Sequence, residues 1–180
     1  MAYTILYIAA SEDGFIADKQ GSVDWLPQEA PEGYDSGFET FVESIDAIAQ
    51  GSRTFIQTIG FIESGIVPDL PYGGKHMYVF TREPMKTDRT DVTFVSSIRE
   101  YLDMINKDSN IRRVWLLGGA ELIASFKADD LIDECIITVI PKKLHEGIAL
   151  PSNLLDGMQQ VASHECYDRI IEKKYIRKSI

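Results

Sequence analysis

Two glycine-containing segments carry the residue types that bind phosphate. Gly118-Gly119 directly follows the apolar run 114–117, and Gly51 follows the run 46–50. A helix is expected directly after Gly118-Gly119, so the first main-chain N–H groups of that helix can donate to phosphate oxygens, and the helix dipole favours their negative charge. The turn after Gly51 is a second copy of the strand-to-glycine pattern, and its amides can bind a diphosphate. The alternative is that each glycine only supplies a positive φ angle to an ordinary strand-to-helix turn. The pattern predicts a crevice whose candidate residues are Gly51, Ser52, Gly118, Gly119, Ala120 and Glu121.

Hydroxyl and guanidinium groups stand close to these turns in the sequence. Arg53 and Thr54 follow Gly51, and Thr81 and Arg82 follow the apolar run 77–80. A guanidinium group binds phosphate through two parallel hydrogen bonds, and open α/β sheets bind ligands at the carboxyl ends of their strands. Two such arginines favour a dinucleotide with an additional phosphate, so the predicted cofactor is NADPH rather than NADH.

Alternating helix and strand patterns predict the elements that position these residues. Amphipathic helices are expected from Ser36 and from Ser97, each with a capping-box glutamate three residues later. A third is expected from Gly119 or Ala120, with Leu122, Ile123 and Phe126 buried. Alternation indicates a mostly parallel sheet, and the α/β class follows from it. The last two strands have no helix between them, which indicates an antiparallel edge. Strands are expected at 4–10, 47–50, 76–81, 92–95, 113–117, 134–140, 161–167 and 169–176.

Residues 11–35 show no periodicity and are rich in glycine and proline. Segments of this length without regular structure inside a compact domain are usually functional lids or disordered. Because Phe15, Ile16 and Trp25 are too apolar for a solvated linker, we predict an ordered lid.

Composition bounds the class of protein. The chain has 180 residues, 44% of them apolar, which suits one hydrophobic core and a single domain over 1–180. No apolar run is long enough to span a bilayer and no signal-peptide pattern is present, so we expect a cytoplasmic protein. The net charge is −10, and residues 1–50 carry −9 of it, with ten acids against Lys19. This excess of acids disfavours nucleic acid and anionic membranes as partners. The expected partner is therefore a small-molecule substrate.

Metal-binding and nucleophile patterns are missing from the sequence. Cys135 and Cys166 stand singly in apolar runs, and the three histidines are far apart. We therefore expect two buried free thiols and no metal site.

The lid segment and the two glycine-containing segments occur in the order in which the dihydrofolate reductase superfamily has them, and the chain resembles that superfamily. It is most similar to the branch formed by the reductase domain of the riboflavin-biosynthesis deaminase/reductases (the RibD C-terminal domain), including small stand-alone members. The resemblance covers nearly the whole length and implies a three-layer fold. It also implies an activity similar to 5-amino-6-(5-phosphoribosylamino)uracil reductase. It rests on residues 11–25, close to the pattern S-x-D-G-x-I-A-x-x-x-G-x-x-x-W, on residues 51–55, and on residues 118–123 with their continuation to Pro141.

The resemblance implies roles for individual cofactor-binding residues. The end of the first strand would hold the nicotinamide carboxamide, and the lid would close over the ring. The threonine after Arg53 and the next hydroxyl-guanidinium pair would hold phosphates and the adenosine ribose, and the Gly118-Gly119 bond would be cis. The positions concerned are Ala9 and Ala10 in the strand, Ile16 and Ala17 in the lid, then Thr54, Thr81 and Arg82.

The substrate side is defined by fewer residues. By resemblance, the substrate would stack beside the nicotinamide near Trp25 and Phe38, beneath the helix that starts near Ser36. Asp35 is the candidate proton donor by position. Its alternative role is to complement the dipole of that helix with its charge.

Three positions depart from the family pattern and bear on the substrate. Ser52 stands where arginine is common, so Arg53 must supply the charge. Leu117 stands where the riboflavin-pathway reductases usually have an acid. Dihydrofolate reductases have an arginine for the folate tail ahead of the third strand, and this chain offers only Lys75 in that region. The expected substrate is therefore a small pyrimidine-like or pteridine-like heterocycle, with folate disfavoured.

Other functional classes remain open. The runner-up is a nucleotide-binding protein of the same fold without turnover, acting as a sensor or partner module. A purely structural protein would bind no nucleotide. The apolar C-terminal strands, which carry basic residues, suggest a homodimer that pairs across a two-fold axis; these basic residues are Lys173, Lys174, Arg177 and Lys178.

Overall fold

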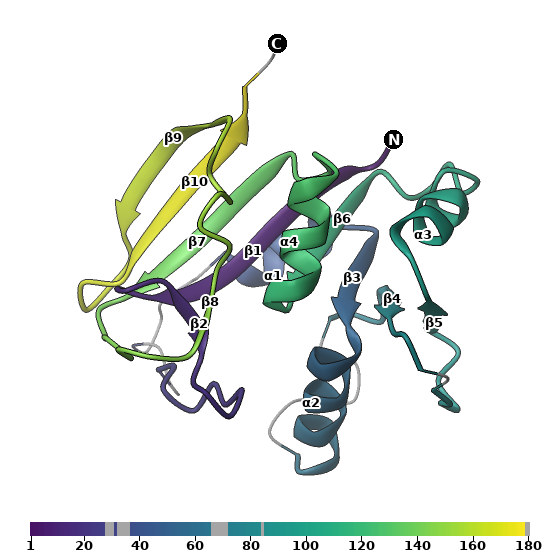
Figure 1. Cartoon of the computed structure of the whole chain (residues 1–180), viewed down its shortest axis with the longest axis horizontal. Coiled ribbons are helices and arrows are strands. Elements are labelled where there is room, and N and C mark those ends of the chain that lie inside the picture. Colours follow the sequence, from purple (N-terminus) through teal and green to yellow (C-terminus); the bar gives the residue numbers. More distant parts are fainter. Residues whose placement is uncertain (28–30, 32–36, 66–71, 84, 179–180) are drawn as a thin grey trace.

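An eight-stranded sheet forms the centre of the computed structural model, which describes residues 1–27, 31, 37–65, 72–83 and 85–178 (Figure 1). The strand order is β5-β4-β3-β6-β1-β7-β10-β9. These strands are β1 (Tyr3–Ser11), β3 (Ala47–Gly51), β4 (His76–Phe80), β5 (Val92–Val95), β6 (Arg113–Gly118), β7 (Glu134–Ile140), β9 (Met158–Glu165) and β10 (Ile171–Arg177). A separate small sheet joins β2 (Phe15–Ala17) to β8 (Ile148–Ala149), and the helices are α1 (Phe38–Ser44), α2 (Ser52–Glu63), α3 (Ile98–Ile105) and α4 (Ala120–Ala128).

The large sheet is parallel from β5 to β7, and β10 and β9 continue it in antiparallel fashion. The predicted mostly parallel sheet with an antiparallel C-terminal edge is confirmed. Because parallel strands end at the same edge, the carboxyl ends of β1, β3, β4 and β6 lie together.

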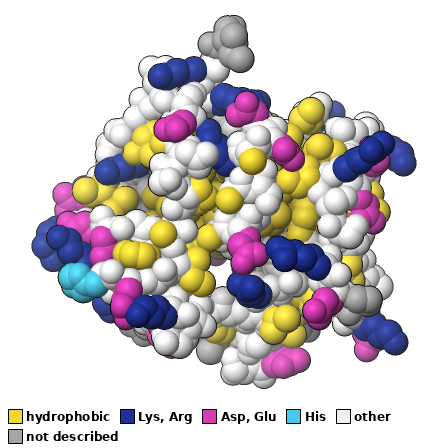
Figure 2. Space-filling view, in the orientation of Figure 1, with side chains coloured by type: hydrophobic (Ala, Val, Ile, Leu, Met, Phe, Trp, Pro, Cys, Tyr) yellow, Lys and Arg dark blue, Asp and Glu magenta, His cyan; other side chains and the backbone are white. Residues whose placement is uncertain are grey.

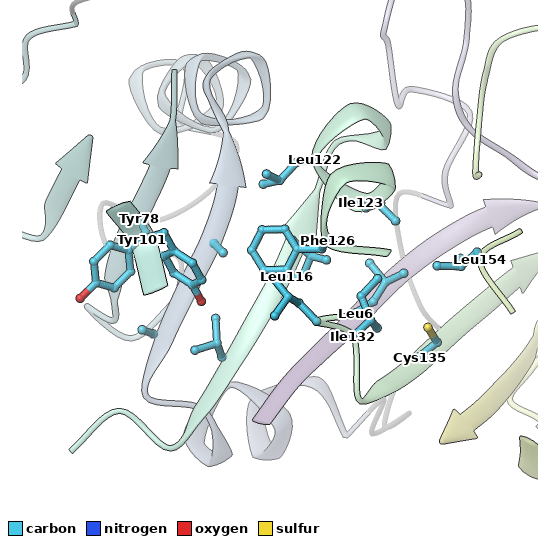
Figure 3. Close-up of a cluster of buried hydrophobic side chains, with 14 of the residues drawn as sticks. Leu6, Tyr78, Tyr101, Leu116, Leu122, Ile123, Phe126, Ile132, Cys135 and Leu154 are labelled. Carbon is cyan, nitrogen blue, oxygen red and sulfur yellow. The ribbon is translucent and has the colours of Figure 1, made fainter. Parts of the chain in front are cut away.

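Helices cover both faces of the sheet, so the predicted three-layer α/β fold is confirmed. Side chains of α3 and α4 join one buried cluster, and those of α1 and α2 join another on the opposite face. Successive residues of β6 point to the two faces, with Leu116 in the first cluster and Trp115 in the second. Figure 3 shows the first cluster, where Phe126 of α4 lies over Leu116. The burial expected for α4 is confirmed.

Two helix starts test the capping-box prediction. In α3 the Ser97 hydroxyl accepts the N–H of Glu100 at 3.2 Å, so that cap is confirmed. In α1 the N-cap is Gly37, in the left-handed conformation (φ 68°), one residue after the predicted start. Glycine adopts this conformation without steric cost, and Ser36 lies outside the described residues.

The elements missed by the sequence analysis are α2, β2 and β8. The two strands span three and two residues, too few to show a periodicity. By contrast, α2 has a pattern from which it could have been predicted. It buries Phe55 and Thr58, and apolar residues continue this spacing at Ile59 and Ile62, as is typical of an amphipathic helix.

The cysteines differ from each other. Cys135 is buried and burial raises its pKa to about 12, whereas Cys166 is only half-buried. Both are free thiols. Within the described part of the chain, no helix has the length and apolar character needed to cross a membrane.

Candidate functional site

The two glycine turns lie side by side at the carboxyl edge of the sheet. Gly51 ends β3 and Gly118 ends β6, and these strands are neighbours. A Cβ built on Gly51 would lie 3.7 Å from the carbonyl oxygen of Gly118 and 3.8 Å from the nitrogen of Gly119. A side chain at Gly51 would therefore stand between the two turns.

Both turns open helices at which the described residues show no side-chain cap hydrogen bond. Gly51 is the N-cap of α2 and Gly119 is the N-cap of α4, and neither start has a side-chain hydrogen bond of the kind that Ser97 provides for α3. The donors and positive dipole ends of two helices therefore lie next to each other. This arrangement suits anionic oxygen atoms such as those of a diphosphate.

Gly118 is held in a conformation that other residues rarely adopt. Its φ is 122°, and its bond to Gly119 is cis, as the resemblance implies. A Cβ on Gly118 would lie 3.7 Å from Cδ1 of both Ile8 and Ile123. The turn therefore packs directly on β1 and α4.

Two arginines meet at this edge through one carboxylate. Nη1 of Arg53, in α2, lies 3.4 Å from Oε1 of Glu121, and Nη2 of Arg82, after β4, lies 3.4 Å from Oε2. The arginine side chains are 86% and 91% exposed and that of Glu121 is 69% exposed. Three predicted cofactor residues from different elements thus share one exposed position beside the turns.

The two threonine hydroxyls of the prediction have different surroundings. A Cβ on Gly119 would lie 3.6 Å from Oγ1 of Thr54, so that hydroxyl borders the second turn. The Thr81 hydroxyl donates to the carbonyl of Glu83 at 2.7 Å and accepts its N–H at 3.2 Å. Thr54 therefore faces the crevice, while Thr81 closes a local turn.

The carboxyl end of β1 is no longer paired with β6. These strands pair from Tyr3 to Leu6 on the β1 side, whereas β1 stays paired with β7 as far as Ser11. The divergence places Ala9 and Ala10 at a gap in the sheet. Ala10 is 3% exposed and Ala9 is half-buried.

The start of the lid is fixed by Asp13. Its carboxylate accepts the Ser11 hydroxyl at 2.7 Å and the N–H groups of Leu144 and His145 at 3.1 and 2.8 Å. The hydrogen bond from Ser11 has the largest effect, and together these bonds lower the pKa of Asp13 to about 2. The Ser-x-Asp-Gly part of the sequence pattern thus joins the β1–β2 turn to the loop after β7.

Further contacts order the rest of the lid. Ile16 and Ala17 lie in β2, which pairs with β8, and the side chain of Gln57 in α2 donates to the carbonyl of Gly21 at 3.3 Å. Residues 11–27 are therefore ordered, as predicted, and their closing over a ligand stays a prediction. Residues 28–30 and 32–35 lie outside the described residues.

An aromatic wall, formed by Tyr7, Phe38, Phe41 and Trp115, lies on the α1 face of the sheet. The ring of Phe38 lies 5.6 Å from that of Trp115, and Phe41 lies 4.7 Å from Tyr7, measured between centroids. The Tyr7 hydroxyl donates to Oε2 of Glu172 at 3.0 Å. Burial and the adjacent Glu172 raise the pKa of Tyr7, so the phenol keeps its proton at neutral pH.

The indole N–H of Trp25 is buried and has no hydrogen-bond partner among the described residues. A buried donor of this kind costs free energy unless a ligand or water accepts from it. Trp25 therefore remains a substrate-side candidate on structural grounds.

Comparison with known proteins identifies the family. Residues 72–161 match the model of the RibD C-terminal domain. An uncharacterized protein of Bacillus subtilis (strain 168), YwjB, is 34% identical over 97% of both chains. A second, YyaP, is 32% identical over 79% of this chain and 77% of its own.

The chain belongs to the RibD C-terminal domain family.

Solved structures agree with this assignment. A candidate riboflavin biosynthesis protein from Shewanella sp. PV-4 superposes with a TM-score of 0.83 at 28% identity, covering 99% of this chain and 100% of its own. Dihydrofolate reductase from Enterococcus faecalis, complexed with NADP(H) and RAB-propyl, has a TM-score of 0.64 at 18% identity, with 98% of this chain and 97% of that chain covered. The second likeness shows a shared reductase-like fold.

Within this RibD-type fold, most of the expected site residues gather at one edge. Asp35 lies outside the described residues, so its place in the site stays a prediction. Sequence reasoning missed Tyr7, Gln57 and Glu172. Glu172 opens the charged run of β10, which resembles a solvated strand in the sequence, and only the register places it opposite Thr138.

Proposed function

We propose that this protein is an NADPH-dependent reductase that transfers hydride directly to a small pyrimidine-like or pteridine-like heterocycle. The reaction would be similar to that of 5-amino-6-(5-phosphoribosylamino)uracil reductase. The observation that carries the proposal is the pair of uncapped helix starts at Gly51 and Gly119, beside Arg53 and Arg82.

The residues at this edge fit a pyridine dinucleotide. The helix starts and Thr54 would hold the diphosphate, because donors without a side-chain cap converge there. Arg53 and Arg82 would bind the additional phosphate. The main chain of Ala9 and the open end of β1 would hold the carboxamide.

When bound, the reduced nicotinamide supplies the hydride, and the protein supplies orientation and a dry site. Ile16 and Ala17, held by the β2–β8 pairing, would exclude water from the ring. Asp35 remains the proposed proton donor.

The aromatic wall would hold the heterocycle. Phe38 offers a ring for stacking, and the Trp25 N–H offers a hydrogen-bond donor without a partner among the described residues. Flat, weakly polar ligands fit such surroundings because aromatic faces bury area while a few polar groups fix orientation.

Fluorescence titration with NADPH tests the cofactor site. Arg53→Ala should weaken binding about tenfold, since a charge-assisted bond is lost. Gly51→Ala should weaken binding without lowering the melting temperature, because its Cβ has ordinary contact distances of 3.7 and 3.8 Å in the free protein but stands between the two turns. Gly60→Ala, inside the helix that Gly51 precedes and with no atom within 4 Å of the new Cβ, is the matched control.

The outcomes separate the functional classes. Oxidation of NADPH with one member of a panel of pyrimidines and pteridines supports the reductase. NADPH binding without turnover on the whole panel favours the runner-up, a nucleotide-binding module. Absence of binding overturns the proposal.

We also propose a homodimer. At the C-terminal end of the sheet the edge strand is β9, not the basic β10, which lies between β7 and β9. Lys174 and Arg177 of β10 already pair with Glu134 and Asp133. Edge pairing of β9 with a second copy would satisfy its outward main-chain groups.

A further inference from the structure

Glu121 occupies the position where the two arginines converge. Each of its carboxylate oxygens faces one guanidinium group, Oε1 that of Arg53 and Oε2 that of Arg82, both at 3.4 Å. In Figure 2, acidic and basic side chains lie next to each other over the N-terminal ends of α2 and α4. The protein itself therefore places an anion where an anionic ligand would bind.

This arrangement has a consequence for any ligand that brings a phosphate to Arg53 and Arg82. The phosphate must either displace the Glu121 carboxylate or lie close to it, and like charges repel. Glu121 also lies in the first turn of α4, where its charge reduces the attraction of the helix dipole for a second anion.

The same carboxylate favours a different ligand group. In dinucleotide sites, an acidic side chain accepts a hydrogen bond from the ribose 2′-hydroxyl of a cofactor that lacks the additional phosphate, whereas arginine accommodates the phosphate. The three side chains at this edge therefore combine both recognition elements in one position.

We infer that Glu121 is the residue that sets cofactor choice, because its carboxylate competes with the 2′-phosphate of NADPH for Arg53 and Arg82 and tolerates the 2′-hydroxyl of NADH. The inference rests on the proposed function. Two arginines without Glu121 would give a stronger preference for NADPH than this chain has.

The magnitude follows from the exposure of the three side chains. Exposed ion pairs of this kind contribute little each, so release of both arginines should change NADPH affinity by about 3- to 10-fold rather than by orders of magnitude. The effect should shrink at high salt, because exposed charges are screened.

The test is titration of the full chain with NADPH and with NADH at low and high salt. Glu121→Gln should tighten NADPH binding about 3- to 10-fold. The affinity for NADH should stay within about twofold of the wild-type value or fall slightly. Glu165→Gln, an exposed glutamate of the edge strand β9, is the control for net charge and should change neither affinity. In an Arg53→Gln/Arg82→Gln background, Glu121→Gln should tighten NADPH binding less than it does in wild type, because only the direct repulsion and the dipole effect remain.

Each outcome decides one claim. If wild type binds NADPH but Glu121→Gln leaves the NADPH-to-NADH affinity ratio within about twofold, the role of Glu121 is wrong and the proposed function stands. The claim that Glu121 competes for the two arginines is equally wrong if the gain in NADPH affinity is as large without the arginines as with them. If neither protein binds either dinucleotide, the proposed function fails and the inference fails with it. A merely structural role of Glu121 at the start of α4 would lower the melting temperature without changing the ratio.

Discussion

Single side chains in this protein act as fixed points between segments that are distant in sequence. Asp13 is the clearest example, since it accepts from the Ser11 hydroxyl and from the main chain of Leu144 and His145. An exposed carboxylate with several donors is held in its charged form. The lid start and the loop after β7 therefore depend on one negative charge.

The stability contribution of Asp13 should depend on pH. Its pKa is lowered to about 2 in the folded protein, so the contribution is present above the unfolded value of about 4 and is lost as pH falls towards the folded value. We expect Asp13→Asn to lower the melting temperature at pH 7, and the difference from wild type to shrink below about pH 5. A difference that stays constant from pH 7 to pH 3 contradicts this account. Thermal unfolding followed by circular dichroism measures it.

Gln50 is a buried polar residue with incomplete hydrogen bonding. The side chain is fully buried, and its Nε2 donates to the Met77 sulfur at 3.2 Å. Its Oε1 has no hydrogen-bond partner among the described residues. Gln50→Met should raise the free energy of unfolding by about 1 kcal/mol, because a buried unsatisfied carbonyl is removed at similar side-chain length.

Urea unfolding measures this gain. Gln159→Met, on the exposed strand β9, is the matched control and should change stability little. A loss of stability in Gln50→Met would show that the amide satisfies a polar group that the core requires.

At the scale of elements, the sequence predicts the parts that have strong local patterns. The strands β5 and β7 have the predicted bounds, and α4 buries the predicted stripe of Leu122, Ile123 and Phe126. These elements are buried on a regular period, and regular burial is what a sequence pattern reports.

The parts that could not be predicted depend on contacts between distant segments. β2 is three residues long and forms only because β8 pairs with it, 131 to 134 residues later in the chain. Similarly, the junction of Arg53 and Arg82 at Glu121 needs the β4-β3-β6 strand order, which no local pattern specifies. The sequence pattern predicts both glycine turns and a crevice that they share, but not the strand order that brings them together.

The pairing of β2 with β8 gives a prediction about the lid. A Cβ on Gly147 would overlap the carbonyl oxygen of Ala17. Gly147→Ala should therefore move β8 away from β2 and destabilise the protein by about 1–3 kcal/mol. NADPH affinity should fall as well, because Ile16 and Ala17 lose their support.

Gly60→Ala provides the comparison for this variant. A new Cβ there meets no atom within 4 Å, inside α2, so stability should rise by about 0.5–1 kcal/mol. Equal melting temperatures for Gly147→Ala and wild type would show that β8 does not support the lid.

At the scale of the whole molecule, the sheet has one long exposed edge. β9 is exposed along most of its length, and Val161 is 45% exposed at a point where the pairing with β10 shifts register. Val161→Lys should convert the proposed homodimer to a monomer, since a charge on an edge strand opposes edge-to-edge pairing. Sedimentation velocity checks this. A wild-type protein that sediments as a monomer at all concentrations would instead show that the register shift protects the edge.

The central claim is that the turns after β3 and β6 jointly hold one pyridine dinucleotide. The most direct measurement is NADPH titration of ¹⁵N-labelled protein, with the main-chain amides of residues 51–54 and 118–121 followed by NMR. We predict that both groups of amides shift together and give one common Kd. Shifts confined to one turn, or to residues remote from both, would contradict the account.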